Sequence, residues 1–402
     1  MNKKDENERR RKNISADASI REMSLTPHDN TKQTPQQRFS SIAARHGPGG
    51  RESDAGIKAC VFGSSGFLGR YVVASLAQIG AQVNIPHRGD EMDVRHLNLT
   101  GDLGRVINYP FSPRHEGSIK RAMEGCDVVI NLIGKDYDTK HVLPWWVNYD
   151  QDEVNVEIPN RLARSAKECG VRQFIHVSAL AASKDSPSDW ARTKALGEEE
   201  VKRSFPGATI VRPADVFGDE DRFLNTYASM ARALPRFLLN NDGTPLKQPV
   251  WCNDVANAIH AMVQNPDAIN QTYELAGPDV MSTCVCVCVC STCLCTTLTQ
   301  ILKHPTGTKE VVEFVFQQIR RPPEVVDLPP LFLHGLATLM EFGPSPKMTR
   351  DKLKLDSQDI ILRSDSRAAT FEDLGITPSG MEHISIRFLH QYRLGGHFLE
   401  TS

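Results

Sequence analysis

The chain has 402 residues, 40% of them hydrophobic, so it is long enough to bury a sizeable core. Its formal net charge is −2 and 24% of its residues are charged, which argues against a nucleic-acid-binding protein and against a wholly disordered chain. It contains no run of about 18 uncharged apolar residues, so we expect no transmembrane helix. Four of the ten cysteines are isolated along the chain and are typical of small buried residues in a reducing compartment: Cys60, Cys126, Cys169 and Cys252.

The first 55 residues have little apolar periodicity and are rich in Ser, Thr, Gln, Asn and Arg. A mitochondrial presequence is amphipathic, rich in Arg and Ser, and poor in acidic residues. Residues 2–12 break the last condition, whereas the stretch that begins at Met23 meets it better. We therefore expect residues 1–55 to be either a disordered tail or a mitochondrial presequence, and the second interpretation places the start of translation at Met23.

From Gly56 onward, short apolar segments alternate with amphipathic ones. We expect buried strands at 57–62, 82–85, 127–131, 173–178 and 208–212, and helices at 66–77, 118–123, 158–168 and 190–203. This alternation predicts an α/β protein built on a Rossmann-type doubly wound parallel sheet, with helices on both faces.

After Pro213 the alternation weakens, and two helices are expected, around 223–233 and 255–264, before an irregular C-terminal region. We assign residues 56–218 to the Rossmann domain and residues 219–402 to a smaller C-terminal lobe over the carboxyl ends of the strands. Later segments are expected to complete the sheet.

Cysteine and valine alternate strictly from Cys284 to Cys290, and Cys290 and Cys293 have the CxxC spacing of some metal and redox sites. No second chelating pair accompanies them, and a TG dinucleotide repeat would encode the same alternation. We therefore interpret residues 281–308 as a retained-intron insert, give this stretch no function, and predict no metal site.

A glycine-rich turn follows the first expected strand and opens the first helix. Gly63 provides the backbone freedom of the turn, Gly66 lets the backbone approach a pyrophosphate, and Gly69 lets the helix pack closely on the strand. The helix N-terminus adds unpaired N–H donors and a favourable dipole for phosphate. In this strand–turn–helix context the turn predicts an NAD(P)-binding loop. Its contacting residues are expected to be Gly63, Ser65, Gly66, Phe67, Leu68 and Gly69.

The end of the second expected strand indicates which nucleotide binds. An NAD site usually has a carboxylate there to hold the ribose 2′-hydroxyl, whereas Arg88 stands at this position and can pair with a 2′-phosphate. The sequence therefore favours NADPH over NADH. Asp90 lies close enough to keep NADH open.

Several motifs together resemble the atypical, extended short-chain dehydrogenases/reductases. They are the glycine turn at 63–69, Asn131 to Gly134, Ser178, and the run from Arg212 to Gly218. Further stretches are similar to a family of NADPH-binding accessory subunits of mitochondrial respiratory complex I. These stretches lie at 46–51, 69–73, 101–104, 128–134, 217–225, 247–250 and 372–376. The resemblance runs from His46 nearly to the C-terminus and is broken only at the cysteine-rich stretch.

This resemblance implies NADPH as a structural cofactor of a non-catalytic accessory subunit. It implies other complex I subunits as partners and a place on the peripheral arm, on the matrix side of the mitochondrial inner membrane, with no nucleic acid bound. It also implies further nucleotide contacts at Leu132, Ile133, Gly134, Ser178, Lys194 and Pro213. One departure is visible, because Ser112 stands where the family usually has an Asp near the adenine.

Short-chain dehydrogenase chemistry uses a Tyr four residues before a Lys, together with a Ser. The phenol exchanges the proton during hydride transfer, the Lys lowers the pKa of the phenol and holds the ribose, and the Ser polarises the substrate oxygen. Ser178 and Lys194 match this pattern, but Trp190 stands where the Tyr is required. An indole N–H only donates and does not titrate usefully. We therefore predict that the protein is not an enzyme, and that Ser178 and Lys194 persist as ribose contacts.

Two other functions stay open. An NADP-dependent reductase or epimerase-like enzyme would need a substitute proton donor, such as Tyr137 or Tyr149. An NADPH-sensing Rossmann regulator would exchange its nucleotide rapidly instead of holding it.

Two further features each admit more than one interpretation. The tryptophans at 145, 146 and 251 mark either a partner surface or packing within the molecule. The charged stretch at 350–354 contacts either lipid headgroups or a neighbouring subunit, or is an ordinary solvated face.

Overall fold

The structure is a computed structural model, and the parts of the chain that it describes are 55–137, 149–233, 237–239, 245–279, 308–322, 325–327, 330–341, 346, 348–363 and 367–393. Three features singled out in the sequence fall outside these ranges. They are the N-terminal tail except Ala55, the suspected insert at 281–308 except Thr308, and the tryptophans at 145 and 146.

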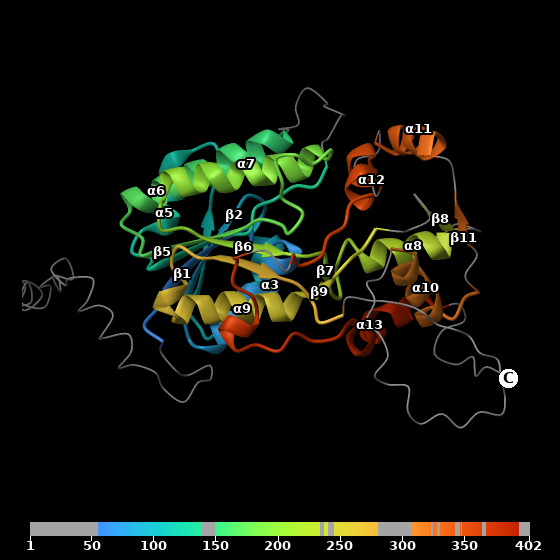
Figure 1. Cartoon of the computed structure of the whole chain (residues 1–402). Coiled ribbons are helices and arrows are strands. Elements are labelled where there is room, and N and C mark those ends of the chain that lie inside the picture. Colours follow the sequence, from blue (N-terminus) through green and yellow to red (C-terminus); the bar gives the residue numbers. More distant parts are fainter. Residues whose placement is uncertain are drawn as a thin grey trace, which may run out of the picture. The chain divides into compact units, whose positions relative to one another are not determined.

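Seven parallel strands form one sheet in the order β10-β6-β5-β4-β1-β2-β3 (Figure 1). The strands are β1 (Lys58–Phe62), β2 (Gln82–His87), β3 (Val106–Pro110), β4 (Val128–Asn131), β5 (Gln173–Val177), β6 (Thr209–Pro213) and β10 (Thr272–Leu275). The strand order reverses between β1 and β4, which pair from Ala59 with Val128 to Phe62 with Asn131. In open α/β sheets, ligands bind in the crevice at the carboxyl ends of strands at such a reversal. The predicted α/β class with a doubly wound parallel sheet is confirmed.

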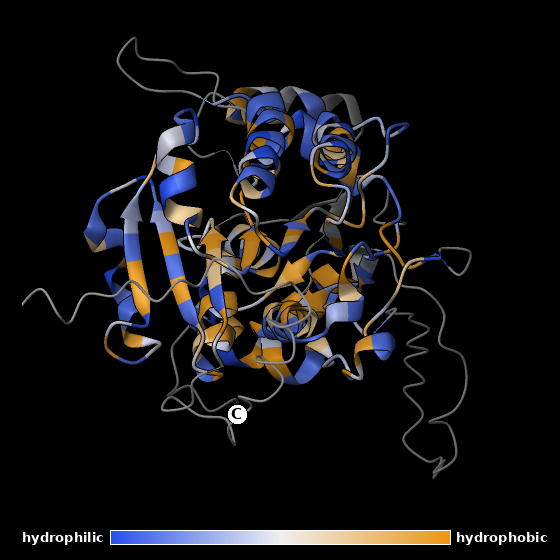
Figure 2. Ribbon diagram, turned by 90° about the vertical axis from the view of Figure 1, so that its left-hand side faces the viewer, coloured by the Kyte–Doolittle hydropathy of each residue, from blue (hydrophilic) through white to orange (hydrophobic). Residues whose placement is uncertain are grey.

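Helices cover both faces of this sheet. One face carries α3 (Phe67–Gln78) and α9 (Cys252–Gln264), and the other carries α5 (Glu116–Met123), α6 (Ile158–Glu168) and α7 (Asp189–Ser204) (Figure 1). Figure 2 shows the apolar strands between the two helical layers. Central strands such as β4 and β5 are buried along their whole length, as expected when both faces of a parallel sheet are covered.

The core between the sheet and the layer of α5, α6 and α7 is built from interlocking apolar side chains. Phe62, Val129 and Phe174 reach it from the strands, and Ile158 and Leu162 reach it from α6. Burying one such side chain contributes roughly 1.5–3 kcal/mol to stability. This layer matters for function because α6 and α7 stand directly behind the crevice.

The sequence predicted no residue range for two strands of the sheet, β3 and β10. The side chains of β3 are half-buried or exposed at the edge of the sheet, so the strand has no continuous apolar run. At the other edge, β10 comes from far beyond residue 218, as does α9, and β10 pairs with β6 from Thr272 with Ile210 to Leu275 with Pro213. Segments of the chain after residue 218 therefore complete the sheet.

The remaining elements form smaller structures at the carboxyl side of the sheet. The helices are α4 (Glu91–Val94), α8 (Leu224–Ala233), α10 (Thr308–Gln318), α11 (Pro330–Met340), α12 (Arg350–Asp356) and α13 (Met381–Leu389). Strand β7 (Val216–Phe217) pairs with β9 (Val250–Trp251), and β8 (Phe237–Leu239) pairs with β11 (Val325–Asp327). Elements α8, α10 and α13 share an apolar core that includes Leu224, Val315 and Phe388. Trp251 packs against this core, so it contributes to internal packing. Among the described helices, none is long and apolar enough to cross a membrane.

Candidate nucleotide-binding site

The turn between β1 and α3 requires glycine at two positions. Gly63 has φ +83°, a left-handed conformation that other residues rarely adopt, and its carbonyl accepts the N–H of Gly66 at 3.0 Å. A Cβ at Gly69 would collide with the Gly63 carbonyl oxygen and would lie 2.6 Å from Ser64 Cα. Gly66 precedes α3 without any side-chain cap, which leaves the first N–H groups of this helix available to an anion.

A cavity of about 480 Å³ opens in front of this turn, at the carboxyl ends of the strands. Its volume lies within the usual range for a ligand pocket. Seven of the residues predicted to contact the nucleotide line it: Gly63, Ser65, Gly66, Arg88, Leu132, Ile133 and Gly134. The other wall was not predicted as a site and consists mainly of Phe111, Pro113, Val154 and Ile158. These apolar side chains provide a surface on which a flat base can lie.

Six of the predicted contacts do not line this cavity: Phe67, Leu68, Gly69, Ser178, Lys194 and Pro213. Gly69 acts through the packing of the turn, and the ring of Phe67 lies against Gly218, where a Cβ would be 2.9 Å from its Cζ. Pro213 is buried at the end of β6, and its carbonyl accepts the N–H of Leu180 at 2.8 Å. Ser112 does not line the cavity either. Its backbone N–H donates to Ser118 Oγ, and its carbonyl accepts from the same hydroxyl.

Arg88 lies on the rim of the cavity, beside an aromatic ring that the sequence did not identify as a contact of Arg88. The guanidinium of Arg88 lies 5.0 Å from the ring centre of Tyr149, and that of Arg114 lies 4.5 Å from the same ring. Arg114 is bound by Glu153 through two hydrogen bonds of 2.6 Å. By contrast, Arg88 has no carboxylate partner among the described residues, and Asp90 does not line the cavity. The charge of Arg88 is therefore available to an anionic ligand.

Lys194 projects from α7 toward the loop that follows β4. It is only 5% exposed, and its Nζ would lie 2.9 Å from a Cβ at Gly134. Burial lowers the pKa of Lys194 to about 8, although Glu198 and Asp136 act in the opposite direction. The ammonium is thus held against the cavity wall at low solvation, where ribose hydroxyl groups of a nucleotide could accept its hydrogen bonds.

His176 lies behind Lys194 and cannot serve as a proton shuttle near neutral pH. Its burial, together with the charge of Lys194, lowers the pKa of His176 to about 3. The amide of Asn131 accepts the Ile133 N–H through its oxygen and therefore turns its NH₂ group to His176 Nδ1, at 3.1 Å. The neutral ring consequently carries its proton on Nε2, which has no hydrogen-bond partner in the described part of the chain.

Ser178 and Trp190 complete the positions that short-chain dehydrogenase chemistry would use. Ser178 is buried just after β5, and its Oγ has no partner among the described residues. Trp190 is half-buried in the first turn of α7, one helical turn before Lys194. A buried hydroxyl without a partner costs free energy, so Ser178 Oγ fits a site that a polar ligand completes.

The N-terminus of α7 is held by a residue of the C-terminal lobe. One carboxylate oxygen of Asp351 accepts the N–H of Asp189 at 2.7 Å, and the other accepts the N–H of Trp190 at 3.0 Å and the hydroxyl of Ser188 at 2.9 Å. Within the charged stretch at 350–354, Asp351 is therefore a helix cap that acts across the molecule. The sequence could not reveal this contact, because its partners are more than 160 positions apart.

The other end of α12 lies beside a buried lysine that contacts two partly exposed aspartates. Lys247 is 1% exposed, and its Nζ lies 3.6 Å from Asp356 Oδ1 and 3.7 Å from Asp215 Oδ2. A third link joins Arg222 to Asp136 at 2.8 Å, next to the Gly134 wall of the cavity. The C-terminal lobe is thus attached to the edge of the nucleotide crevice at several polar points. Within the described ranges, no three metal-binding side chains come together.

The profile of the NAD dependent epimerase/dehydratase family matches residues 59–276. The NADH dehydrogenase (ubiquinone) 1 alpha subcomplex subunit 9, mitochondrial, of Arabidopsis thaliana is 39% identical over 364 residues, which cover 88% of this chain and 82% of that protein. The protein of the same name from Rattus norvegicus is 38% identical over 349 residues, covering 87% and 84%. The crystal structure of the NADPH-dependent quinone oxidoreductase QOR2 from Escherichia coli, complexed with NADPH, superposes with a TM-score of 0.58 at 15% identity, covering 82% of this chain and 99% of that one.

Proposed function

Because the chain belongs to the family of mitochondrial complex I alpha subcomplex subunit 9 and carries an NAD dependent epimerase/dehydratase domain, we propose that it is a non-catalytic accessory subunit that holds NADPH as a structural cofactor. The observation that carries this proposal is that the chain has an intact glycine turn and an available Arg88, but has Trp at position 190. The first two features favour binding of a nucleotide phosphate, and the third removes the proton donor.

The choice of NADPH rests on charge at the rim of the cavity. A 2′-phosphate would accept charge-assisted hydrogen bonds from Arg88, which has no carboxylate to neutralise it within the described residues. The adenosine ribose of NADH offers Arg88 no charged partner. We assign the second ribose to Lys194, whose Nζ lies beside Gly134, and to the unpartnered hydroxyl of Ser178.

The absence of catalysis rests on proton transfer. A bound nicotinamide supplies hydride chemistry, but carbonyl reduction also requires a proton at the substrate oxygen. Trp190 offers only an N–H that does not titrate, and the low pKa of His176, about 3, keeps that ring neutral and unable to donate readily. The side chains of this site therefore bind and orient a nucleotide without completing a turnover.

A nucleotide held in this way stabilises the folded subunit. Binding only to the native state adds about 2.7 kcal/mol when the ligand is present at 100 times its dissociation constant. The names of the mitochondrial relatives support a place for the chain among the other subunits of complex I. We further propose, from the resemblance described in the sequence, that this place is on the matrix side of the inner membrane.

The decisive test is a blue-native gel of mitochondrial membranes, probed for this chain and stained for NADH dehydrogenase activity. We expect the chain to migrate with the active high-mass band, and nucleotide extracted from that band after affinity purification to contain NADPH in near-stoichiometric amount. Migration only as a small species would refute the accessory role, and extraction of NADH alone would refute the choice of nucleotide.

A second test separates the structural role from a reductase. The purified chain should oxidise no NADPH in the presence of a panel of carbonyl substrates, whereas turnover by the unmodified chain would refute the proposal. The variant Trp190→Tyr then locates the cause, because a gain of turnover in this variant would assign the missing catalysis to that single position.

A further inference from the structure

A tyrosine lies beside two arginines at the rim of the nucleotide cavity. The ring centre of Tyr149 is 5.0 Å from the guanidinium of Arg88 and 4.5 Å from that of Arg114. An aromatic ring attracts a cation at such distances, and a planar guanidinium can stack on its face. The two arginines therefore share one aromatic contact, although only Arg88 also lines the cavity.

Tyr149 is itself held in place by its surroundings. Its ring is half-buried and packs against the apolar core between the sheet and the layer of α5, α6 and α7. Its backbone carbonyl accepts a hydrogen bond of 2.8 Å from Lys135 Nζ. Arg114, beside the ring, is fixed by two hydrogen bonds of 2.6 Å to Glu153, which begins a π-helical turn (Glu153–Glu157) that leads into α6. Such turns are rare and occur frequently at functional sites. The ring is thus a fixed surface at the rim of the cavity.

The side chain of Arg88 depends on this ring for its orientation. Arg88 is exposed, and within the described ranges no carboxylate pairs with it. Its backbone is set by His87, whose Nδ1 donates to the Gly89 carbonyl at 3.1 Å. An exposed arginine otherwise samples many rotamers, and ordering its side chain when a ligand binds costs affinity. A ring that already holds the guanidinium at the rim removes part of that cost.

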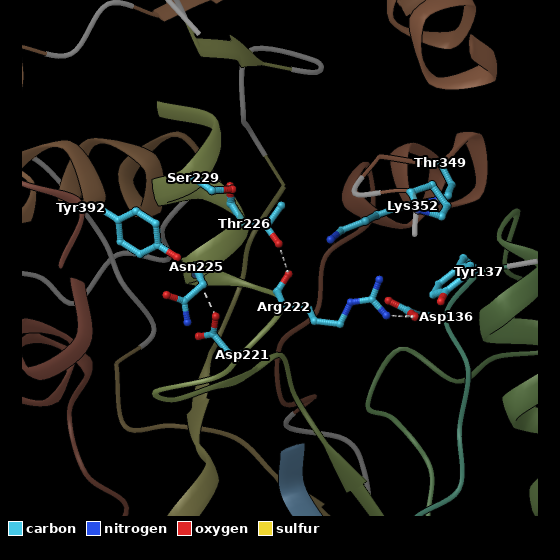
Figure 3. Close-up of a pocket in the computed structure, with 11 residues that line it drawn as sticks. Asp136, Tyr137, Asp221, Arg222, Asn225, Thr226, Ser229, Thr349, Lys352 and Tyr392 are labelled. Atoms are coloured by element: carbon cyan, nitrogen blue, oxygen red, sulfur yellow. Dashed lines mark hydrogen bonds and ion pairs between the residues drawn. The ribbon is translucent and has the colours of Figure 1, made fainter. Parts of the chain in front are cut away.

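A second tyrosine of the same cavity, Tyr137, provides the contrast. Its ring centre lies 5.0 Å from the guanidinium of Arg222 and 5.4 Å from Lys135 Nζ. Asp136 neutralises Arg222 there, as the ion pair in Figure 3 shows. The ammonium of Lys135 is engaged by the carbonyl of Tyr149. Neither cation depends on Tyr137 alone, so we expect this tyrosine to have no part in the choice of nucleotide.

We propose that Tyr149 is a positioning residue that sets the preference for a nucleotide with a 2′-phosphate, because it keeps the guanidinium of Arg88 oriented at the rim before the nucleotide binds. This inference rests on the proposed function, since it requires that Arg88 meets the 2′-phosphate of NADPH. A ribose 2′-hydroxyl carries no charge and gains less from an ordered guanidinium. The apolar contact that the ring offers to a bound nucleotide is the same for NADPH and NADH, and it cancels in the ratio of their affinities.

The test measures the dissociation constants of NADPH and NADH for the full chain and its variants by fluorescence titration. Tyr149→Leu removes the aromatic face, and we expect the preference for NADPH over NADH to fall roughly two- to tenfold, which is the effect of ordering one flexible side chain. Tyr149→Phe keeps the face and should keep the preference. Tyr137→Leu is the matched control, because it removes a ring from the same cavity and should change both affinities by the same factor.

A double-mutant cycle shows whether Tyr149 acts through Arg88. In the Arg88→Gln background, Tyr149→Leu should leave the remaining nucleotide preference unchanged, because the guanidinium that the ring orients is gone. If Tyr149→Leu does not fold, Tyr149→Met takes its place in both experiments, since its flexible side chain fills the space of the ring without an aromatic face.

Three results would overturn the inference: an unchanged preference in Tyr149→Leu, an equal loss of preference in Tyr149→Leu and Tyr137→Leu, or a further loss when Tyr149→Leu is added to Arg88→Gln. Failure of the proposed function has a different signature. The unmodified chain would then bind no NADPH, or Arg88→Gln would leave the preference intact, and either result refutes both proposals. A preference that falls in Arg88→Gln but not in Tyr149→Leu refutes only the role of Tyr149.

Discussion

The two ends of the nucleotide crevice differ in what they retain. At the adenosine end, the turn after β1 and the end of β2 bring Gly63, Gly66 and Arg88 around one cavity. At the other end, Ser178 and Lys194 remain buried and polar, but the residue one helical turn before Lys194 is Trp190. Binding and proton transfer depend on different elements of this fold, so one can be lost by a single substitution while the other persists.

The largest effect is expected from Gly69→Ala, which disrupts the glycine turn at the adenosine end of the crevice. The new Cβ would overlap backbone atoms of Gly63 and Ser64, and neither can move without opening the turn. We expect a loss of stability of about 3 kcal/mol and no measurable NADPH binding, checked by thermal unfolding and by fluorescence titration.

The control for this substitution is Gly335→Ala in α11, where a Cβ would meet nothing within 4 Å. That variant should be neutral or slightly stabilised, because alanine is the better helix former. If Gly69→Ala bound NADPH normally, the adenosine end would not be the binding determinant described here.

The variant Arg88→Gln tests whether the adenosine end of the crevice prefers NADPH to NADH. Loss of a charge-assisted contact of about 1.5–3 kcal/mol should weaken NADPH binding roughly ten- to a hundredfold and leave NADH binding almost unchanged. Parallel titrations with the two nucleotides measure the ratio. An equal loss for both would show that Arg88 supports the cavity without contacting a 2′-phosphate.

The pH dependence of NADPH binding tests the role of Lys194 at the other end of the crevice. Burial lowers the pKa of Lys194 to about 8, so the ammonium loses its proton as the pH rises through that value. If the ribose binds the charged form, NADPH affinity should be constant below pH 8 and fall by up to tenfold per pH unit above it. The same shift makes the folded apoprotein gain stability from pH 8 to about 10.5, where the unfolded lysine also titrates.

Fluorescence titrations between pH 7 and 9.5 measure this profile, and Lys194→Met should flatten it. His176 stays neutral throughout that range, because its pKa is about 3. A flat profile for the unmodified chain would place Lys194 outside the ribose contact.

The smallest effect is expected from Asp351→Ala, which removes the cap that joins the C-terminal lobe to α7. Loss of a helix cap of this kind costs roughly 1–2 kcal/mol, and NADPH affinity should fall only severalfold because Lys194 remains in α7. Urea unfolding measures the first quantity. The control Asp185→Ala changes an exposed acidic residue in the loop before α7, and equal losses in both variants would argue against capping.

The sequence predicted the local features of this molecule well. Helix α6 was expected at 158–168 and occupies Ile158–Glu168, and the glycine turn has the predicted place between β1 and α3. Both depend on short-range patterns of apolar residues and glycines. No range was predicted for β3, because its half-buried edge position leaves no apolar run. None was predicted for β10 either, because only the distant partner β6 makes that segment a strand.

The candidate site shows the same limit. The glycine turn directly follows the first predicted strand, and Arg88 lies just after the second. Both could therefore be assigned to the site from the sequence alone. The contact between Tyr149 and Arg88 and the cap that Asp351 gives to α7 join residues far apart in the chain. Their chemistry is visible in the sequence, but only the fold shows which partners they meet.

The contact between Asp351 and α7 also bears on when the fold around the nucleotide cavity is completed during translation. The glycine turn and the whole of α7 leave the ribosome early, whereas Asp351 follows its partner Asp189 by 162 residues. At about 5–20 residues per second that interval lasts roughly 10–30 s. Until it ends, the nascent chain has a complete glycine turn beside a helix that only its own Ser188 caps, and the N–H groups of Asp189 and Trp190 receive their acceptor only when synthesis is almost finished.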